Sequence, residues 1–135
     1  MTQEDKQLLL ADLCARLPYG VICYDEAQNE TGIFKQFEYE GFGRIHNGRG
    51  MRYIEHIHPI LRPMSSMTEE EEKEFIKILD LEMEALAAPE GHTIASAASS
   101  TFEIDFYNKH HFDYRGLIER GLAIEVTKEN NPYKD

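Results

Sequence analysis

The chain has 135 residues, and its 25 acidic and 14 basic side chains give a formal net charge of −11. This excess of negative charge argues against direct binding to nucleic acid or anionic lipid, which depends on clustered Lys and Arg. The length is that of one domain, and a hydrophobic content of 41% can form a core without disulfides, so we expect no cofactor.

No apolar run approaches the length of a membrane span. The longest, Leu8–Ala11, is far shorter than the ~20 residues that cross a bilayer. The acidic start, Met1–Asp5, lacks the basic and apolar regions of a secretory signal. We therefore expect a cytoplasmic protein without membrane contact.

The first predicted element is a helix that begins after Thr2. Thr2 and Asp5 have the spacing of a helix cap, and Leu9 and Leu13 then repeat at helical spacing. Pro18 should end the helix, because proline cannot continue the hydrogen bonds of a helix interior.

The region between residues 20 and 58 predicts a small sheet. Val21–Tyr24 is apolar on both faces and rich in strand-forming residues, and residues 33–39 have one wetter face. Asn47 followed by Gly48 is typical of a tight hairpin turn, since both residues tolerate positive φ. We expect the sheet to be mostly antiparallel.

Two prolines, Pro59 and Pro63, bracket the next segment, Ile60–Arg62. Proline lacks the N–H group that a central strand or a helix interior needs. We therefore expect this segment to run extended, outside both kinds of element.

The clearest predicted element is a long central helix. Thr68 with Glu71, or Ser66 with Glu69, forms a capping box at its start. Glutamates fill its first turn, where the helix dipole favours negative charge, and Pro89 ends it. Its predicted apolar stripe consists of Phe75, Ile76, Leu79, Met83 and Leu86.

Two weaker elements are expected after the central helix. His92–Ser96 can form a short strand. Ser100 with Glu103 forms a third capping box, which opens a helix that carries Phe106 and ends near His110.

The end of the chain predicts a bend, a turn and a last strand. The bend is Tyr114–Gly116, Gly121 ends the turn, and Ile124–Val126 forms the strand. Residues 128–135 are polar, and we expect a loose tail there. We predict a single α+β domain over residues 1–127, with a mostly antiparallel sheet packed by the N-terminal helix and the long central helix.

The two cysteines, Cys14 and Cys23, both lie in apolar stretches. In a chain without an export signal, we expect buried free thiols rather than a disulfide. Neither cysteine has surroundings that indicate a reactive thiol.

Histidines offer the one pattern that points to metal chemistry. His56 and His58 would share one face of a strand, so both could reach a metal ion if Asp113 folded across to them. His110 or His111 could take part in the same cluster. The alternative, which we favour, is a pair of partly exposed histidines beside a proline corner.

Two arginines, Arg62 and Arg115, lie in predicted turns between apolar neighbours. A guanidinium in such a place can brace loops by donating to carbonyl groups or carboxylates, and we expect that role for both. The alternative is that the two arginines and nearby aromatic residues line one groove that receives an anionic group.

Three long segments carry a resemblance: Leu17–Val21, Leu61–Glu71 and Asn108–Glu119. With them the chain resembles a family of small uncharacterised proteins encoded by phages and integrated mobile elements of Bacteroides-type gut bacteria. The family has no assigned activity, so no site residue is implied. Residues 25–52 and 82–99 lie outside the resemblance, which otherwise runs from the first helix to about Glu125.

The resemblance and the charge together suggest a function. A mobile-element origin implies a cytoplasmic protein of a bacterial host cell that binds a host or phage protein, and a negative surface could steer it to a basic partner. We expect a non-enzymatic protein-binding or regulatory module; the alternative is a small metal-dependent hydrolase. The expected surface residues are Tyr107, His110, His111, Asp113, Tyr114 and Arg115.

Overall fold

The structure is a computed structural model that describes residues 1–37, 42–45, 52–87 and 102–134. A further helix covers residues 102–109. The named elements, in chain order, are α1 (Gln3–Arg16), η1 (Leu17–Tyr19), β1 (Ile22–Asp25), β2 (Glu30–Phe37), β3 (Phe42–Ile45), β4 (Arg52–Tyr53), η2 (Ile54–His56), β5 (Ile57–Leu61), η3 (Met64–Ser66), α2 (Glu69–Ala87) and β6 (Ile124–Glu125).

Local residues set both ends of helix α1. The Thr2 hydroxyl accepts a hydrogen bond from the Asp5 N–H at 3.0 Å, which confirms the predicted cap. Pro18 lies in η1, and Gly20 follows in the left-handed conformation at φ +69°, which glycine adopts without strain. The chain turns there into β1.

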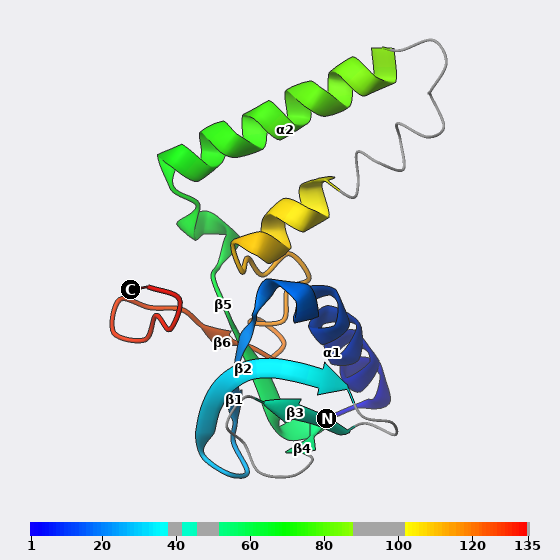
Figure 1. Cartoon of the computed structure of the whole chain (residues 1–135). Coiled ribbons are helices and arrows are strands. Elements are labelled where there is room, and N and C mark those ends of the chain that lie inside the picture. The colour runs from blue at the N-terminus through cyan, green and yellow to red at the C-terminus, as the bar shows by residue number, and fades with distance from the viewer. Residues whose placement is uncertain (38–41, 46–51, 88–101, 135) are drawn as a thin grey trace.

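The strands form one sheet with the order β4-β3-β2-β1-β5-β6. All neighbours are antiparallel except β5 and β6, which pair in parallel with Ile60 opposite Ile124. Helix α1 packs on this sheet (Figure 1). The prediction of a small α+β domain with a mostly antiparallel sheet and an N-terminal helix is confirmed.

Buried side chains of the described residues form a core that joins α1 to the sheet. Leu9 and Leu13 of α1 are fully buried, as is Cys23 of β1. We call α1 and the sheet the body of the molecule. The buried members of its core are Leu9, Leu13, Val21, Cys23, Phe34, Ile45, Ile54, Ile57, Leu61, Leu117 and Leu122.

Both thiols were predicted to be buried. The prediction is wrong for Cys14, which is exposed, whereas Cys23 is buried. Both are free. The buried face of α1 carries Leu9, Asp12 and Leu13, and Cys14 lies about 100° around the helix from Leu13. Burial raises the pKa of the Cys23 thiol well above its usual range, so that this thiol stays protonated.

The prediction that Pro59 excludes a central strand is wrong, because Pro59 lies inside β5 with β1 on one side and β6 on the other. The Leu61 carbonyl accepts from Val126 N–H beside β6. Along a strand, the backbone N–H and C=O groups of residues two apart point to the same neighbouring strand. Because the Leu61 carbonyl faces β6, the nitrogen of Pro59 faces the β6 side too. Strand β6 starts only opposite Ile60, so the missing N–H costs no ladder hydrogen bond.

Strands β3 and β4 pair antiparallel, with Phe42 opposite Tyr53, as the predicted hairpin requires. The turn residues Asn47 and Gly48 lie outside the described residues. The predicted strand 92–96 and the cap at Ser100 also lie outside them.

Helix α2 starts at the Thr68 capping box. Glu71 N–H donates to the Thr68 hydroxyl at 3.2 Å, and Thr68 N–H donates to Glu71 Oε1 at 2.9 Å. The helix then leads away from the sheet, and the helix over 102–109 lies between the two (Figure 1). We call these two helices the helical arm.

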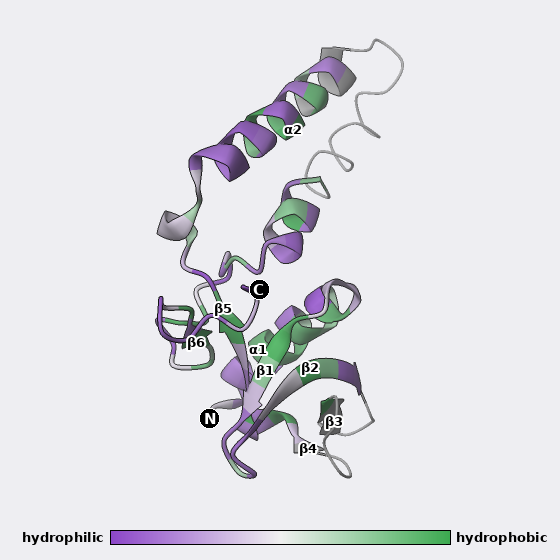
Figure 2. Cartoon of the chain, turned by 60° about the vertical axis from the view of Figure 1, so that its left-hand side comes forward, coloured by the Kyte–Doolittle hydropathy of each residue, from purple (hydrophilic) through white to green (hydrophobic). Residues whose placement is uncertain are grey.

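The packing partner of α2 differs from the prediction. We expected α2 to pack on the sheet, whereas its Phe75 ring lies 5.2 Å from the Phe106 ring and 5.6 Å from the Tyr107 ring of the neighbouring helix. Every described side chain of α2 is half-buried or exposed. Figure 2 shows apolar and polar residues alternating along α2. Because none of its described side chains is fully buried, the sequence stripe does not mark a core face.

The C-terminal segment is anchored at Tyr133. The Tyr133 hydroxyl donates to the Ile60 carbonyl at 2.7 Å and accepts from Ile22 N–H at 2.9 Å, so it bridges β1 and β5. The Tyr133 ring stacks on His111 with centroids 3.7 Å apart. The expectation of a loose tail over 128–135 did not include this anchor, which its polar composition does not reveal.

Candidate functional site

The segment with the six expected surface residues runs from the end of the arm into the body. The helix over 102–109 stops before His111, which has φ +62°. Arg62 N–H donates to the His111 carbonyl at 2.8 Å, and Asp113 N–H donates to the Arg62 carbonyl at 2.9 Å. The segment thereby continues the sheet beyond the end of β5.

Asp113 is buried, and its carboxylate serves the local backbone. It accepts from Leu117 N–H at 2.9 Å and from Ile118 N–H at 3.0 Å. These bonds cap the turn before Gly121, in which orphan N–H groups would otherwise remain. Asp113 is therefore a structural residue and not a surface contact.

Arg115 and Tyr114 contact a buried ionic cluster at the C-terminal end of α1. Asp12 accepts from Arg16 Nε at 2.8 Å and from Arg115 Nη1 at 2.9 Å, and both Asp12 and Arg16 are fully buried. Arg16 also donates to the Phe112 carbonyl at 2.6 Å. The guanidinium carbons of Arg16 and Arg115 lie 5.0 and 4.7 Å from the Tyr114 ring centre. This is the bracing role expected for Arg115.

His110 and Tyr107 lie at the junction of the two arm helices. His110 Nδ1 lies 3.1 Å from Glu71 Oε2, and His110 Nε2 lies 3.1 Å from Glu74 Oε2. Tyr107 stacks on Phe75 at 5.6 Å and on Tyr114 at 5.5 Å. Both residues are half-buried and turned toward their neighbours rather than presented on a free surface.

Arg62 braces the base of the arm, as expected. Its guanidinium forms a bidentate ion pair with Glu71 at 2.6 and 2.7 Å and donates to the Ser66 carbonyl at 3.0 Å. Hydrogen bonds from Arg62 are the main reason that the pKa of the Glu71 carboxyl falls to about 2. The capping glutamate of α2 is thus tied to the end of β5.

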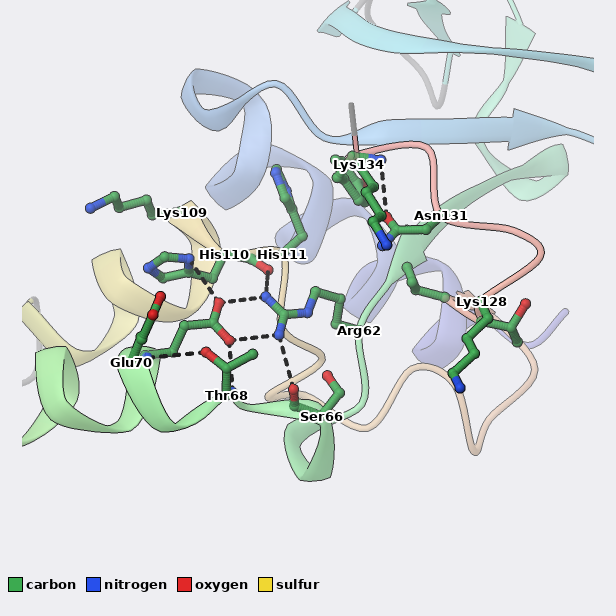
Figure 3. A pocket seen from close by; sticks show the side chains of 14 residues that line it. Arg62, Ser66, Thr68, Glu70, Lys109, His110, His111, Lys128, Asn131 and Lys134 are labelled. Atoms are coloured by element: carbon green, nitrogen blue, oxygen red, sulfur yellow. Dashed lines mark hydrogen bonds and ion pairs between the residues drawn. The ribbon is translucent and has the colours of Figure 1, made fainter.

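A cavity of about 860 Å³ opens beside Arg62 (Figure 3). One wall is the start of α2 with its η3 approach, a second is the end of the arm at His110 and His111, and a third is the C-terminal segment from Val126 to Lys134. Arg115 is not among the lining residues, so the two arginines do not share one groove. The charged and imidazole side chains that line the cavity are Arg62, Glu70, Glu71, Lys109, His110, His111, Lys128 and Lys134.

His111 forms part of that lining and of the tail anchor. Its Nδ1 is buried and has no hydrogen-bond partner within the described residues. Burial, followed by electrostatic interactions with Arg16, His110 and Arg62, lowers the pKa of His111 to about 4. The ring is therefore neutral at pH 7 and stacks on Tyr133 without a charge.

His56 and His58 meet a carboxylate that the sequence analysis did not select. Glu26 Oε1 lies 3.3 Å from His56 Nδ1, and Glu26 Oε2 lies 3.1 Å from His58 Nε2. Hydrogen bonds from the two histidines lower the pKa of Glu26. His58 Nδ1 donates to the Leu122 carbonyl at 3.1 Å.

The metal hypothesis finds no support in this arrangement. Within the described ranges, no group of three His, Cys, Asp or Glu side chains is placed to hold a metal ion. Asp113, the proposed third ligand, is engaged with the backbone of Leu117 and Ile118 instead. His110 and His111 face the arm and the tail.

The arm exposes apolar side chains that sequence analysis assigned to a core face. Ile76 is 51% exposed and Met83 is 70% exposed, and the two lie seven residues apart on one face of α2. On the opposite side of the helix, Leu81 is 57% exposed. The sequence pattern marked Ile76 and Met83 as apolar, but it could not show that their side chains are exposed.

The comparisons with known proteins give no further guide to the site. Neither the family models, nor the curated proteins, nor the solved structures gave a match to this chain. In the part of the chain that the structure describes, no helix is long and apolar enough to cross a membrane. Function must therefore be argued from the surfaces themselves.

Proposed function

We propose that this chain is a non-enzymatic binding protein whose helical arm docks on a partner protein with a basic and apolar surface. The observation that carries the proposal is the exposure of Ile76 and Met83 on one face of α2. Exposed apolar side chains are common on any protein, but a group of them on one projecting element is typical of an interaction site. Of nine large exposed apolar side chains in the described residues, five are on the arm: Ile76, Leu81, Met83, Phe102 and Ile104.

The charge of α2 defines the chemistry of the partner. The helix contains eight acidic residues, against the two lysines Lys73 and Lys77. Acidic groups around an apolar centre favour a partner with the opposite charge, because complementary potentials speed association and exclude like-charged competitors. The acidic residues are Glu69, Glu70, Glu71, Glu72, Glu74, Asp80, Glu82 and Glu84.

The base of the arm is held in place before any partner arrives. The bidentate pair of Arg62 and Glu71 fixes the start of α2, and His110 and Lys109 contact Glu74 at 3.1 and 3.0 Å. A surface that is already ordered loses less conformational entropy on binding. The arm is thus suited to present its apolar face without first rearranging.

The resemblance to phage and mobile-element proteins supports the same class of function. Under this proposal the partner is a host or phage protein in the cytoplasm of a bacterial cell. The six residues first selected from the late motif contribute to the arm and its junction with the body. They position the binding surface and do not form it.

A capture experiment with matched variants tests the proposal. The tagged chain and its Ile76→Ser/Met83→Ser variant are incubated with lysate of a Bacteroides-type host, and the retained proteins are identified by mass spectrometry. Ile33→Ser/Met64→Ser is the control, because Ile33 and Met64 are each 38% exposed and lie outside the arm. We expect one partner, rich in basic residues, to be retained by the chain and the control and lost from the arm variant.

Two results would contradict the proposal. One is a partner that the arm variant retains as well as the unchanged chain does. The other is retention of nothing beyond what a charge-matched acidic protein captures. Circular dichroism of each variant checks that α2 is intact, since two exposed serines lower helix stability by only about 1 kcal/mol.

A further inference from the structure

We infer that the cavity beside Arg62 is a binding site for a small polyphosphate, with Lys128 and Lys134 as its main cationic contacts. This site is separate from the free face of α2 and does not depend on the function proposed for it. The inference rests on the shape of the cavity, on the charges around it and on the fixed position of its walls.

The size of the cavity indicates a small-molecule ligand. Its volume of about 860 Å³ lies within the range of about 300–1,000 Å³ that is common for ligand pockets. A single water molecule occupies about 30 Å³ of liquid, so the cavity has room for a ligand much larger than one phosphate group.

The charges around the cavity reverse the balance of the whole chain. The lining contains four permanent cations and two carboxylates, whereas the chain has 14 basic and 25 acidic residues. One of the two carboxylates, Glu71, is already neutralised by Arg62. Figure 3 shows Lys109, Lys128 and Lys134 on different sides of the central Arg62.

Two of these cations are available for a ligand. Lys109 is paired with Glu74 at 3.0 Å. Lys128 and Lys134 are exposed, and within the described residues neither forms an ion pair. Both lysines line the cavity without an acidic partner among the described residues, and a ligand with several negative charges could pair with each of them.

The walls of the cavity are anchored next to Lys134 and at Arg62. Tyr133, next to Lys134, is held by hydrogen bonds to Ile22 and Ile60 and by the stack on His111. Opposite, Arg62 is held by Glu71 and by the Ser66 carbonyl. The cavity is therefore preformed, which reduces the entropy lost when a ligand binds.

Phosphate oxygens fit the donors that this site offers. Lysine binds phosphate as a mobile point charge, and hydroxyl and amide groups add directional hydrogen bonds. Thr127 and Asn131 line the same wall as the two lysines and supply such groups. A pyrophosphate unit has enough charge to engage both lysines at once.

Isothermal titration of the full chain with inorganic pyrophosphate tests the inference. We expect saturable binding that weakens at least tenfold in Lys128→Ala/Lys134→Ala. The matched control is Lys73→Ala/Lys77→Ala, which removes two exposed lysines from α2 outside the cavity, and we expect it to change the affinity less than twofold. Sulfate at the same ionic strength serves as the comparison for a general salt effect.

The alternative outcomes are decisive. Equal weakening by the two lysine pairs, equal binding of sulfate, or no saturable binding of pyrophosphate would each overturn the inference. A second titration uses adenosine diphosphate in place of pyrophosphate. Tighter binding than pyrophosphate assigns the site to a nucleotide, and equal binding assigns it to the free polyphosphate. Both lysines are exposed, so loss of folding does not complicate the comparison.

Discussion

The body and the helical arm use similar apolar residues in opposite ways. In the body, Leu9 and Leu13 of α1 are fully buried against the sheet, whereas in the arm Ile76 and Met83 are 51% and 70% exposed. Burying one large apolar side chain contributes about 1.5–3 kcal/mol, so Leu9 and Leu13 stabilise the body through contacts that Ile76 and Met83 largely lack. A periodic apolar stripe therefore identifies a helix and leaves open whether its partner is in the same molecule.

Polar side chains show the same contrast. Asp12 of the body is fully buried and binds Arg16 and Arg115, whereas Asp80 of the arm is exposed. Charged groups in the body are thus committed to structure. Asp80 and the other exposed carboxylates of α2 remain in water, where they can be used for recognition at little cost to folding.

The largest predicted effect breaks the ionic cluster of the body. We expect Asp12→Ala to reduce the free energy of unfolding by about 3–5 kcal/mol, because Arg16 would remain buried without its charge partner. Asp80→Ala on the arm should change it by at most about 0.5 kcal/mol. Urea denaturation followed by circular dichroism measures both. Similar values for the two variants would remove the distinction between body and arm.

The second prediction concerns His111, where the arm meets the tail. Its pKa is lowered to about 4 in the folded chain, against an ordinary value of 6.5, so protonation favours unfolding. The stabilisation is complete above pH 6.5 and is lost as the pH falls through 4. The size of the shift corresponds to at most about 3 kcal/mol.

His111→Asn tests this pH dependence, since asparagine tolerates the positive φ found at this position. We expect the unfolding free energy of the unchanged chain to fall more steeply between pH 6.5 and 4 than that of the variant. Both proteins are measured at each pH, so contributions from Glu71 and other shared groups cancel. If the unfolding free energies of the two proteins fall equally with pH, His111 is not buried as a neutral ring.

The sequence predicted local features well, because their causes lie within a few residues. The Thr2 cap and the Thr68–Glu71 capping box each depend on side chains three positions apart, and the end of the turn depends on the positive φ of Gly121 itself. The bracing role expected for Arg62 is also present, since its guanidinium pairs with the Glu71 carboxylate. Its partner Glu71 was identified only as a cap.

Features that depend on distant parts of the chain could not be predicted from spacing. Tyr133 is 111 residues from Ile22, and Arg16 is 96 residues from Phe112, yet hydrogen bonds join each pair. Glu26 meets His56 and His58 only because β1 and β5 are neighbours in the sheet. No local pattern distinguishes these residues from ordinary surface groups.

The late motif shows what composition can and cannot say about a site. Its density of polar and aromatic residues led to the prediction of an exposed binding surface. Asp113 and Arg115, however, interact inside the molecule, with Leu117 and Asp12 as partners. The residues that now form the candidate surfaces, Met83 of α2 and Lys128 of the tail, stand out only once their neighbours are known.

The smallest predicted effect concerns Tyr133 and tests whether the C-terminal tail stabilises the body. Tyr133→Phe removes the hydroxyl that bridges Ile22 and Ile60, and leaves backbone groups of β1 and β5 without a partner. We expect a loss of about 1–2 kcal/mol in the free energy of unfolding, measured by urea denaturation. Tyr24→Phe is the control, since its hydroxyl bonds only to nearby Asn29 at an exposed position.

The two tyrosines separate a structural anchor from a surface hydrogen bond. Removing an exposed bond lets water replace it, so Tyr24→Phe should cost less than Tyr133→Phe. The difference matters for the cavity as well, because Tyr133 fixes the wall that carries Lys128 and Lys134. If Tyr133→Phe destabilises the chain no more than Tyr24→Phe, the tail contributes nothing to the body, and the cavity loses one of its fixed walls.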